Sequence, residues 1–364
     1  MYITTTQKAL EEAIYAAQRV APTNPPLPVL SGVLLSAKGE KLTVTGTSLN
    51  TTIISSIAPE EILDEGEAVL PAKHFYELVK RLPDGTITLI KEEGHVKVLY
   101  GKQQANVKYS PPEEFPVLPE ITGVEVEIDT ESLRGALQKV TFACATDEIH
   151  GILTGVFFCA TPFGVEFVAS DRYRISYINV ADIVVGDSEF KITVPKTALE
   201  QLKLFTDKKI KILIDKNMAV FQGENLLMAS RLLTGKFINY NSFPKEFDSQ
   251  FVVNSRELLD TLSRAALLDN RVVLEGDGSS LLVSTAGEKG SLCESIKMNH
   301  TGKPIDIALN IKYLTDALVV SGNEVKLKFM ANKMCQVEQG NYYCLISATV
   351  KPAVTKSDFV EKSA

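Results

Sequence analysis

The stretch that decides the fold is Leu153–Val180, with the sequence LTGVFFCATPFGVEFVASDRYRISYINV. It holds three short segments rich in Val, Phe and Ile, at 154–159, 164–169 and 174–180, and a turn signal separates each from the next. Thr-Pro-Phe-Gly makes the first turn and Ser-Asp-Arg-Tyr the second, because Gly, Pro, Asp and Ser favour the backbone angles of turns. The stretch predicts an antiparallel meander of three strands.

The same pattern occurs at Leu30–Ile57, LSGVLLSAKGEKLTVTGTSLNTTIISSI, and more weakly at Arg271–Met298, RVVLEGDGSSLLVSTAGEKGSLCESIKM. A helical pattern precedes each copy, and a second one follows it after Leu-Pro-Ala-Lys, Val-Pro-Lys-Thr or Leu-Asn-Ile-Lys. The chain is therefore expected to be α+β, with three repeated domains, each of two helices on about eight antiparallel strands. We expect domains at 1–122, 123–247 and 248–352, and a disordered tail at 353–364.

Composition bounds the class of protein. Of the 364 residues, 45% are hydrophobic and 23% are charged, as in soluble globular proteins. No apolar run is long enough for a membrane span, the N-terminal segment lacks the features of a signal peptide, and a cytoplasmic protein is expected. The five scattered cysteines are expected to be buried free thiols in a reducing compartment: Cys144, Cys159, Cys293, Cys335 and Cys344.

No pattern of catalytic residues stands out. His74, His95, His150 and His300 are spread over the repeats without metal-ligand spacing. Neither a phosphate-binding loop nor a nucleophile elbow is present. We therefore expect no enzymatic activity, no metal and no cofactor.

Charge is distributed unevenly. The six predicted helices carry twelve basic and eight acidic residues, although the whole chain has a net charge of −7. Helices that face a common opening would make it positive, and such charge binds phosphates without reading sequence. Ordinary amphipathic helices would produce the same bias about equally often, so charge alone leaves both interpretations open.

Seven segments, in order and spacing, resemble one known family: LPVLSGVLL, LPAKHFYELVKRLPDGTITL, PPEEFPVLPE, LTGVFF, ASDRYRIS, VPKTALEQL and LLTGKFINY. The chain resembles the beta subunit of bacterial DNA polymerase III, the sliding clamp family, over residues 7–351. The resemblance implies a ring of two chains joined head to tail around duplex DNA, with helices lining the hole. Such a ring is not an enzyme: it slides, and it tethers the polymerase by raising its local concentration.

The resemblance also implies a groove that binds short peptides of the polymerase alpha subunit, the clamp loader and other proteins with clamp-binding motifs. Apolar walls would come from Leu153, Ile175, Ile238, Phe243 and Leu345, while Arg172 and Arg174 would hold the polar end. The matching positions are Leu153, Ser170, Asp171, Arg172, Tyr173, Arg174, Ile175, Ile238, Phe243, Leu345, Ser347, Ala348 and Thr349. The alternative for 171–173 is a polar hairpin corner without a binding role.

The positions that would face DNA are Lys8, Arg19, Asn24, Lys73, Lys80, Arg81, Arg134, Lys139, His150, Lys196, Lys203 and Arg264. An apolar seam between two chains would involve Val107, Leu267 and Leu268. The chain departs from the family at Arg172, Tyr173 and Ile238, and at its C-terminal end, which indicates a divergent member. A non-encircling protein of the same fold that sequesters clamp partners is the alternative function, and no membrane partner is expected.

Overall fold

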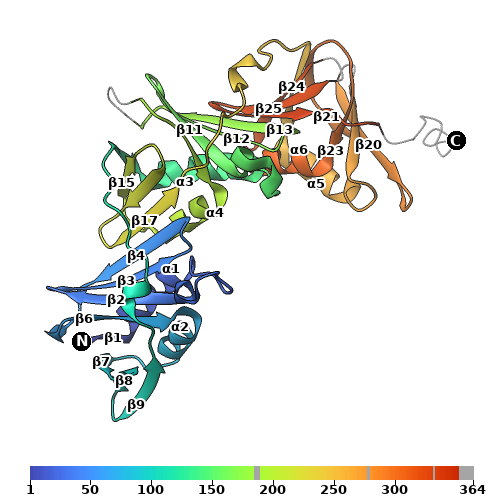
Figure 1. Ribbon diagram of the computed structural model, residues 1–364. Helices are drawn as coiled ribbons and strands as arrows, with labels where there is room; N and C mark the ends of the chain where they lie inside the picture. The colour runs from blue at the N-terminus through green and yellow to red at the C-terminus, as the bar shows by residue number, and fades with distance from the viewer. Residues whose placement is uncertain (184–188, 277–278, 331–332, 352–364) are drawn as a thin grey trace. The chain divides into compact units, whose positions relative to one another are not determined.

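The computed structural model describes residues 1–183, 189–276, 279–330 and 333–351; the predicted tail at 353–364 lies outside them. The chain forms two compact units (Figure 1). The first contains residues 1–130 and 198–232, and the second contains residues 131–197 and 233–364. All strand pairings described are antiparallel, and the predicted α+β class is confirmed.

Each repeat contains two helices and eight or nine strands, as predicted. The first repeat contains β1 (Tyr2–Thr6), α1 (Gln7–Gln18), β2 (Gly32–Lys38), β3 (Lys41–Thr47), β4 (Thr51–Ile57), β5 (Glu61–Asp64), β6 (Gly66–Pro71), α2 (Ala72–Lys80), β7 (Thr86–Glu92), β8 (His95–Tyr100) and β9 (Gln103–Lys108).

The second repeat contains β10 (Val124–Asp129), α3 (Thr130–Val140), β11 (Gly155–Thr161), β12 (Gly164–Ser170), β13 (Arg174–Val180), β14 (Lys191–Pro195), α4 (Lys196–Leu199), β15 (Lys209–Ile214), β16 (Met218–Gln222) and β17 (Leu226–Arg231). Its second helix is shorter than the sequence predicts, because α4 gives way to a 3-10 helix, η5 (Glu200–Leu204).

The third repeat contains β18 (Ser249–Asn254), α5 (Ser255–Ala265), β19 (Arg271–Gly276), β20 (Ser280–Gly287), β21 (Gly290–Lys297), β22 (Asn299–Gly302), β23 (Ile305–Asn310), α6 (Ile311–Val319), β24 (Glu324–Met330), β25 (Met334–Gln339) and β26 (Tyr342–Ser347). The elements follow the same order as in the first repeat.

Polar side chains at strand ends start several helices without a loop. Thr6 Oγ1 accepts a hydrogen bond from the Ala9 N–H at 3.2 Å, Asn254 caps α5 and Asn310 caps α6. A capping residue satisfies a backbone N–H that the helix itself leaves unpaired. The apolar face of the helix then packs on the sheets: Leu10 and Ile14 of α1 are fully buried. Each such side chain contributes about 1.5–3 kcal/mol through burial.

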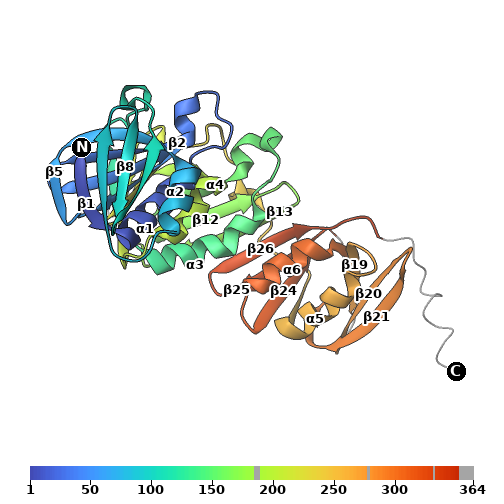
Figure 2. The same ribbon diagram turned by 90° about the horizontal axis from the view of Figure 1, so that it is seen from below.

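The two helices of the first repeat pack against each other on one side of its sheets (Figure 2). Phe75 of α2 is fully buried in the same core as Leu10. The third repeat pairs α5 with α6 in the same way. The three predicted helix starts after Leu-Pro-Ala-Lys, Val-Pro-Lys-Thr and Leu-Asn-Ile-Lys are found at α2, α4 and α6.

The sheets continue from one repeat into the next. One sheet has the order β10-β15-β16-β17-β4-β3-β2-β6, and another has the order β14-β11-β12-β13-β26-β25-β24-β18-β22. In both, the last strand of one repeat pairs with the third meander strand of the repeat before it. We call the β17–β4 pairing the first junction and the β26–β13 pairing the second junction.

Four of the five cysteines are buried and free, as expected, but Cys293 is exposed. It lies on β21, which is an edge strand of the sheet β21-β20-β19-β23. The expectation of five buried thiols is therefore wrong at this position, because side chains alternate between the two faces of a strand and Cys293 lies on the face of β21 that is open to solvent. No helix in the described part of the chain is long and apolar enough to cross a membrane.

Candidate functional site

The five apolar residues predicted to wall the groove lie in one cluster of the second unit. Leu153, Ile175 and Leu345 are buried there, and Ile238 and Phe243 pack against them half-buried. The second junction brings two of these residues together, because Ile175 of β13 lies directly opposite Leu345 of β26. Residues that are far apart in sequence thus meet at one site.

A tight hairpin forms the polar end of this site. Ser170 Oγ donates to the Arg174 carbonyl oxygen at 2.8 Å, and Asp171 Oδ1 accepts from the backbone N–H groups of Tyr173 and Arg174, each at 3.1 Å. Arg172 is exposed and has φ of 81°, in the left-handed region that non-glycine residues seldom adopt. These hydrogen bonds fix the conformation of the hairpin, and the Arg172 side chain is exposed to solvent.

Arg174 holds the hairpin to α6. Its Nε donates to Asp171 Oδ2 at 2.9 Å and its Nη1 to Asp316 Oδ2 at 2.7 Å. Nη2 donates to the Phe142 carbonyl oxygen at 2.8 Å, and the guanidinium lies 4.4 Å from the ring centroid of Tyr313. Burial opposes the charge, but the two carboxylates outweigh it and raise the pKa of Arg174. Because these contacts occupy Arg174, Arg172 is the better candidate for a peptide's polar end.

Tyr173 is 62% exposed, and its ring stacks on that of Tyr313 with 6.3 Å between centroids. The predicted C-terminal residues run alongside: the Ser347 N–H donates to the Tyr173 carbonyl oxygen at 2.9 Å, and the Thr349 N–H donates to that of Ala308 at 2.8 Å. Ala348 is half-buried between them. These contacts bring the predicted groove residues near one another at the second junction, and we keep the name groove for this set of residues, whose binding role stays a prediction.

Sequence reasoning missed how the segment that carries Ile238 and Phe243 is fixed. Glu166 of β12 accepts hydrogen bonds from the hydroxyls of Tyr240, at 2.5 Å, and Tyr177, at 2.9 Å. Burial and these bonds to Glu166 raise the pKa of both tyrosines well above the usual value. Phe237 stacks on Phe157 at 4.9 Å between centroids. Phe237 and Tyr240 were the available signal, but their partners lie on other strands: Phe157 is on β11, and Glu166, on β12, is 74 residues from Tyr240.

The predicted DNA-facing residues differ in their surroundings. Lys8, Lys73, Lys80 and Lys203 are exposed on or beside α1, α2 and η5, and Asn24 is exposed in a loop. Polar partners hold three of the arginines: Arg19 Nε donates to Gln201 Oε1 at 2.6 Å, Arg81 pairs with Glu77 at 2.8 Å, and Arg264 pairs with Glu294 at 2.5 Å. Arg134, Lys139, His150 and Lys196 are half-buried. Their contact with DNA stays a prediction.

Of the predicted seam residues, Val107 lies on an end strand of a sheet, and Leu267 and Leu268 follow α5. Val107 is on β9, the end strand of the sheet β5-β1-β7-β8-β9. Leu267 is 72% exposed just after α5, and the neighbouring Leu268 lies close to Gly290, the first residue of β21. Among the described residues, no group of His, Cys, Asp and Glu has the arrangement of a metal site.

Comparison with known proteins identifies all three repeats. Residues 1–119, 127–239 and 241–343 match the family models of the N-terminal, central and C-terminal domains of the DNA polymerase III beta subunit. The domain bounds given above from the sequence stay predictions. The beta sliding clamp of Synechococcus elongatus is 30% identical, with 90% of this chain and 92% of that protein covered, and that of Bacillus subtilis is 27% identical, with 90% and 93% covered.

Solved structures agree with this match. The sliding clamp of Bacillus subtilis superimposes with a TM-score of 0.91 at 26% identity, covering 97% of this chain and 100% of that one. The DNA polymerase III beta subunit of Pseudomonas aeruginosa gives a TM-score of 0.92 at 23% identity, covering 96% and 100%. From the repeats, the sheet order and these similarities together, the chain belongs to the family of bacterial beta sliding clamps, the beta subunits of DNA polymerase III.

Proposed function

We propose that this chain is a DNA sliding clamp: a homodimeric ring around duplex DNA that tethers a polymerase and other partners through the groove. The proposal places it in the bacterial cytoplasm, associated with the nucleoid, as a non-catalytic accessory of DNA polymerase III. The single observation that carries the ring is the position of β9 and β21, which both lie at the ends of described sheets. β9 is the counterpart of β17 and β26, and β21 is the counterpart of β4 and β13. Each chain therefore has one strand of each type that is free to pair, and β9 of one copy can pair with β21 of another.

The internal junctions supply the register of that missing pairing. In the first junction the first residue after the Leu49–Asn50 loop, Thr51, lies opposite Ser230, the fifth residue after the 224–225 loop. In the second junction Arg174 lies opposite Ile346, again the first residue against the fifth. The two junctions therefore share one register.

Applied to the free edges, this register sets Gly290 of one copy opposite Val107 of the other, and Cys293 opposite Gln104. The inward-facing residues Ala105 and Leu292 also fall opposite each other, as the alternation of a pleated sheet requires. Leu268, beside Gly290, then meets Val107 across the joint. This apolar contact is the one that the sequence predicts.

A cysteine substitution tests the ring directly. In the proposed register Gln104 corresponds to Tyr343 and Cys293 to Tyr177, a directly opposed pair whose rings stack. Opposed residues of this kind have Cα atoms about 5.5 Å apart, which suits a disulfide. Gln104→Cys should therefore form a covalent dimer on mild oxidation, and this ring should stay on nicked circular DNA through a high-salt wash and leave after linearisation.

Gln103→Cys is the matched control, because its side chain points to the opposite face of β9. It should cross-link poorly, and Cys293→Ser should abolish the cross-link of Gln104→Cys. A chain that is monomeric at micromolar concentration, or a Gln104→Cys protein that never cross-links, would remove the ring from the proposal.

The groove is proposed to bind extended peptides with Leu and Phe anchors. Tyr173→Ala together with Phe243→Ala removes an exposed aromatic ring and one apolar wall, so affinity for a fluorescein-labelled polymerase peptide should fall at least tenfold in fluorescence anisotropy. The Gln104→Cys cross-link should form normally in the same protein. Unchanged peptide affinity would show that the groove lies elsewhere.

A further inference from the structure

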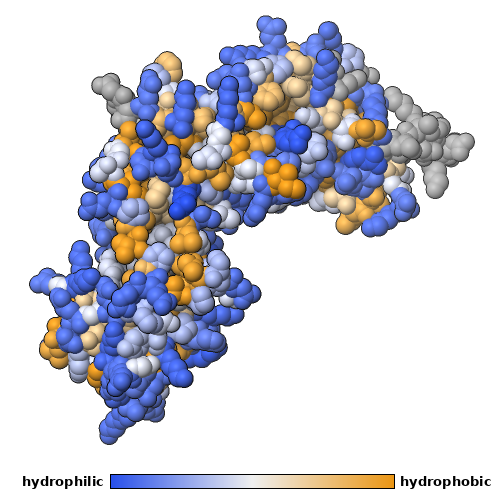
Figure 3. All heavy atoms as spheres, in the orientation of Figure 1, coloured by the Kyte–Doolittle hydropathy of each residue, from blue (hydrophilic) through white to orange (hydrophobic). Residues whose placement is uncertain are grey.

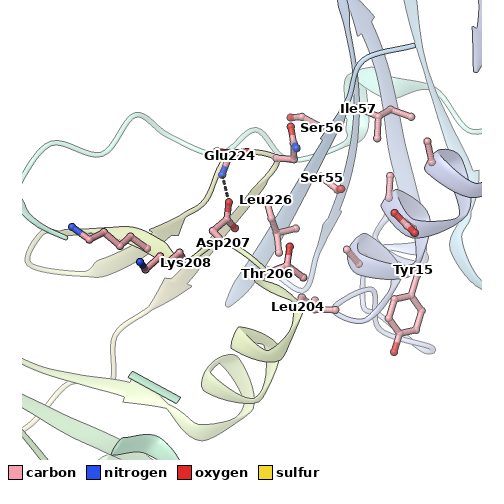
Figure 4. Close-up of a pocket in the computed structure, with 16 residues that line it drawn as sticks. Tyr15, Ser55, Ser56, Ile57, Leu204, Thr206, Asp207, Lys208, Glu224 and Leu226 are labelled. Carbon is pink, nitrogen blue, oxygen red and sulfur yellow. Dashed lines mark hydrogen bonds between the residues drawn. The ribbon is translucent and has the colours of Figure 1, made fainter. Parts of the chain in front are cut away.

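The first unit contains a hollow of about 810 Å³ beside the first junction. One wall is α1, where Ala9, Ala13 and Ala16 form a row of small side chains next to Tyr15. Figure 4 shows Leu204, Thr206 and Leu226 across from this helix, with Ser55 between them. Its volume lies within the range of ligand sites in proteins.

The second junction fills the corresponding place with its own side chains. Ser55 lies opposite Leu226 in the first junction, and their counterparts in the second junction are Ile178 and Tyr342, which also lie opposite each other. Ala16 is the tenth residue of α1, and the tenth residue of α3 is Lys139. At all three positions the first junction has the smaller side chain, and this difference in volume accounts for the hollow.

The side chains that occupy the corresponding space in the second junction indicate which chemical groups the hollow can accommodate. Tyr342 is fully buried, and its hydroxyl donates to the Ala317 carbonyl oxygen of α6 at 3.4 Å. Lys139 of α3 lies over the same ring, with Nζ 5.6 Å from the centroid. An aromatic ring thus spans the space between two helices, with a cation above it. This arrangement is favourable because the ring face carries partial negative charge.

The charges around the hollow favour a cation and disfavour phosphate. Glu12 of α1, Asp207 and Glu224 contribute three carboxylates to its lining. Of the two lysines there, Lys209 pairs with Glu127 at 2.6 Å, so its charge is already matched. Figure 4 shows Lys208 directed away from α1. A nucleic-acid strand would meet net negative charge here, whereas a basic side chain would find carboxylate partners.

We propose that the hollow is a second protein-binding site, which takes an aromatic side chain of a partner protein together with an adjacent Lys or Arg. The ring occupies the volume that Tyr342 fills in the second junction, between Ala16 and Leu226. The base lies near Glu12 and Glu224, over the ring. The site is separate from the groove, which belongs entirely to the second unit, and its partner need not compete with the polymerase.

Three short peptides test the proposal with the full-length protein: acetyl-Gly-Tyr-Lys-Gly-amide, the same peptide with Glu in place of Lys, and the same peptide with Ala in place of Tyr. Binding would be followed by NMR of isotope-labelled leucine methyl groups, with Leu226 and Leu204 as reporters. The Tyr-Lys peptide should shift both signals saturably, with a dissociation constant of about 1 mM, as expected for so small a ligand. The Tyr-Glu peptide should bind at least tenfold more weakly, and the Ala-Lys peptide should not saturate.

A filled variant supplies the decisive comparison. Ala16→Lys with Leu226→Tyr copies the second junction into the first, and Tyr-Lys binding should be lost while the groove peptide binds as before. Ser55→Ile is a milder filling that serves if the double variant unfolds, and it should weaken Tyr-Lys binding at least threefold. Equal binding of all three peptides, or Tyr-Lys binding that survives in a folded filled variant, would overturn the proposal.

Discussion

Arg174 shows how one side chain can support a binding surface without meeting its ligand. It is 6% exposed and joins the hairpin at 171–174 to α6 through Asp171 and Asp316. A buried charge is tolerated only when such partners compensate its loss of hydration. The position of the exposed Tyr173, which directly precedes Arg174 in the chain, therefore depends on Arg174, although a bound peptide need not contact Arg174.

Replacing Arg174 by Ala should lower the free energy of unfolding by about 3 kcal/mol, because Asp171 loses its ion-pair partner and Asp316 keeps only Lys312, while both stay partly buried. Urea denaturation of the two proteins measures this difference. Arg172→Ala, at the neighbouring exposed position, should change stability by less than about 0.5 kcal/mol. Equal effects of the two substitutions would contradict the role given to Arg174.

The pair formed by Arg264 and Glu294 predicts a small acid sensitivity. A hydrogen bond from Arg264 lowers the pKa of Glu294, so its contribution is present above the unfolded-state pKa of about 4.3 and is lost as pH falls through the lower folded-state pKa. Since the Arg264 side chain is 51% exposed, we expect only a few tenths of a kcal/mol. Glu294→Gln should remove this part of the stability loss between pH 5 and pH 3, measured by urea midpoints, whereas the wild-type loss should persist in Glu40→Gln.

The segment between β17 and β18 has little regular structure, only the 3-10 helix Tyr240–Ser242, and side chains attach it to the sheet. It carries Ile238 and Phe243 into the groove, and Tyr240 fastens it to Glu166 on β12. Regular hydrogen-bond ladders fix strands, but a segment without a ladder relies on side chains for its position. The groove's apolar wall is thus held by one carboxylate and a few stacked rings.

Tyr240→Phe should weaken this attachment, because Glu166 loses one of its two tyrosine hydroxyl partners. We expect a loss of about 1–2 kcal/mol in unfolding free energy and a measurable drop in groove-peptide affinity. Tyr343→Phe, on the same sheet but outside this segment, should leave peptide affinity unchanged. If both substitutions weaken the peptide equally, the segment is not held by Tyr240.

In the molecule as a whole, the repeat determines which edges and surfaces remain open. Three meanders of three strands each give two internal junctions, and β9 and β21, the counterparts of the strands joined there, stay at the ends of described sheets. Hydrophilic residues predominate on the face shown in Figure 3, with apolar residues between them.

Reversing Lys80, Arg81 and Lys139 to Glu should shorten retention of the assembled ring on DNA and reduce the salt dependence of binding. Each phosphate contact contributes about 0.9 to the slope of log K against log salt, so losing all three would lower the slope by about 3. The measurement is fluorescence anisotropy of labelled duplex DNA at several salt concentrations. Reversal of Lys41, Lys216 and Lys245, which are exposed outside the helices, should have a smaller effect; an equal effect would contradict a cationic helix face.

The sequence predicted the repeats because they are local patterns. The alternation of apolar residues and the turn residues within 153–180 specify a meander without reference to distant parts of the chain. The groove's five apolar residues were also found, through resemblance, and the structure brings them into one cluster.

Long-range pairings could not be predicted in this way. Asp316 lies 142 residues from Arg174, and Tyr240 lies 74 residues from Glu166, so no spacing rule connects them. The hollow was equally hidden, because it depends on comparing Ala16, Ser55 and Leu226 with counterparts that are known only once the strand register is known. The equivalent positions, and so the differences in side-chain volume between them, can be identified only from the folded structure.

The exposed sulfur of Cys293 has a practical consequence. It is the one exposed cysteine, it stands on an open strand edge, and the proposed association would cover it. A maleimide dye should therefore label dilute protein quickly and concentrated protein slowly, with no engineered tag. The labelling rate, measured over a range of protein concentrations, would give the dissociation constant of the association from the native cysteine alone.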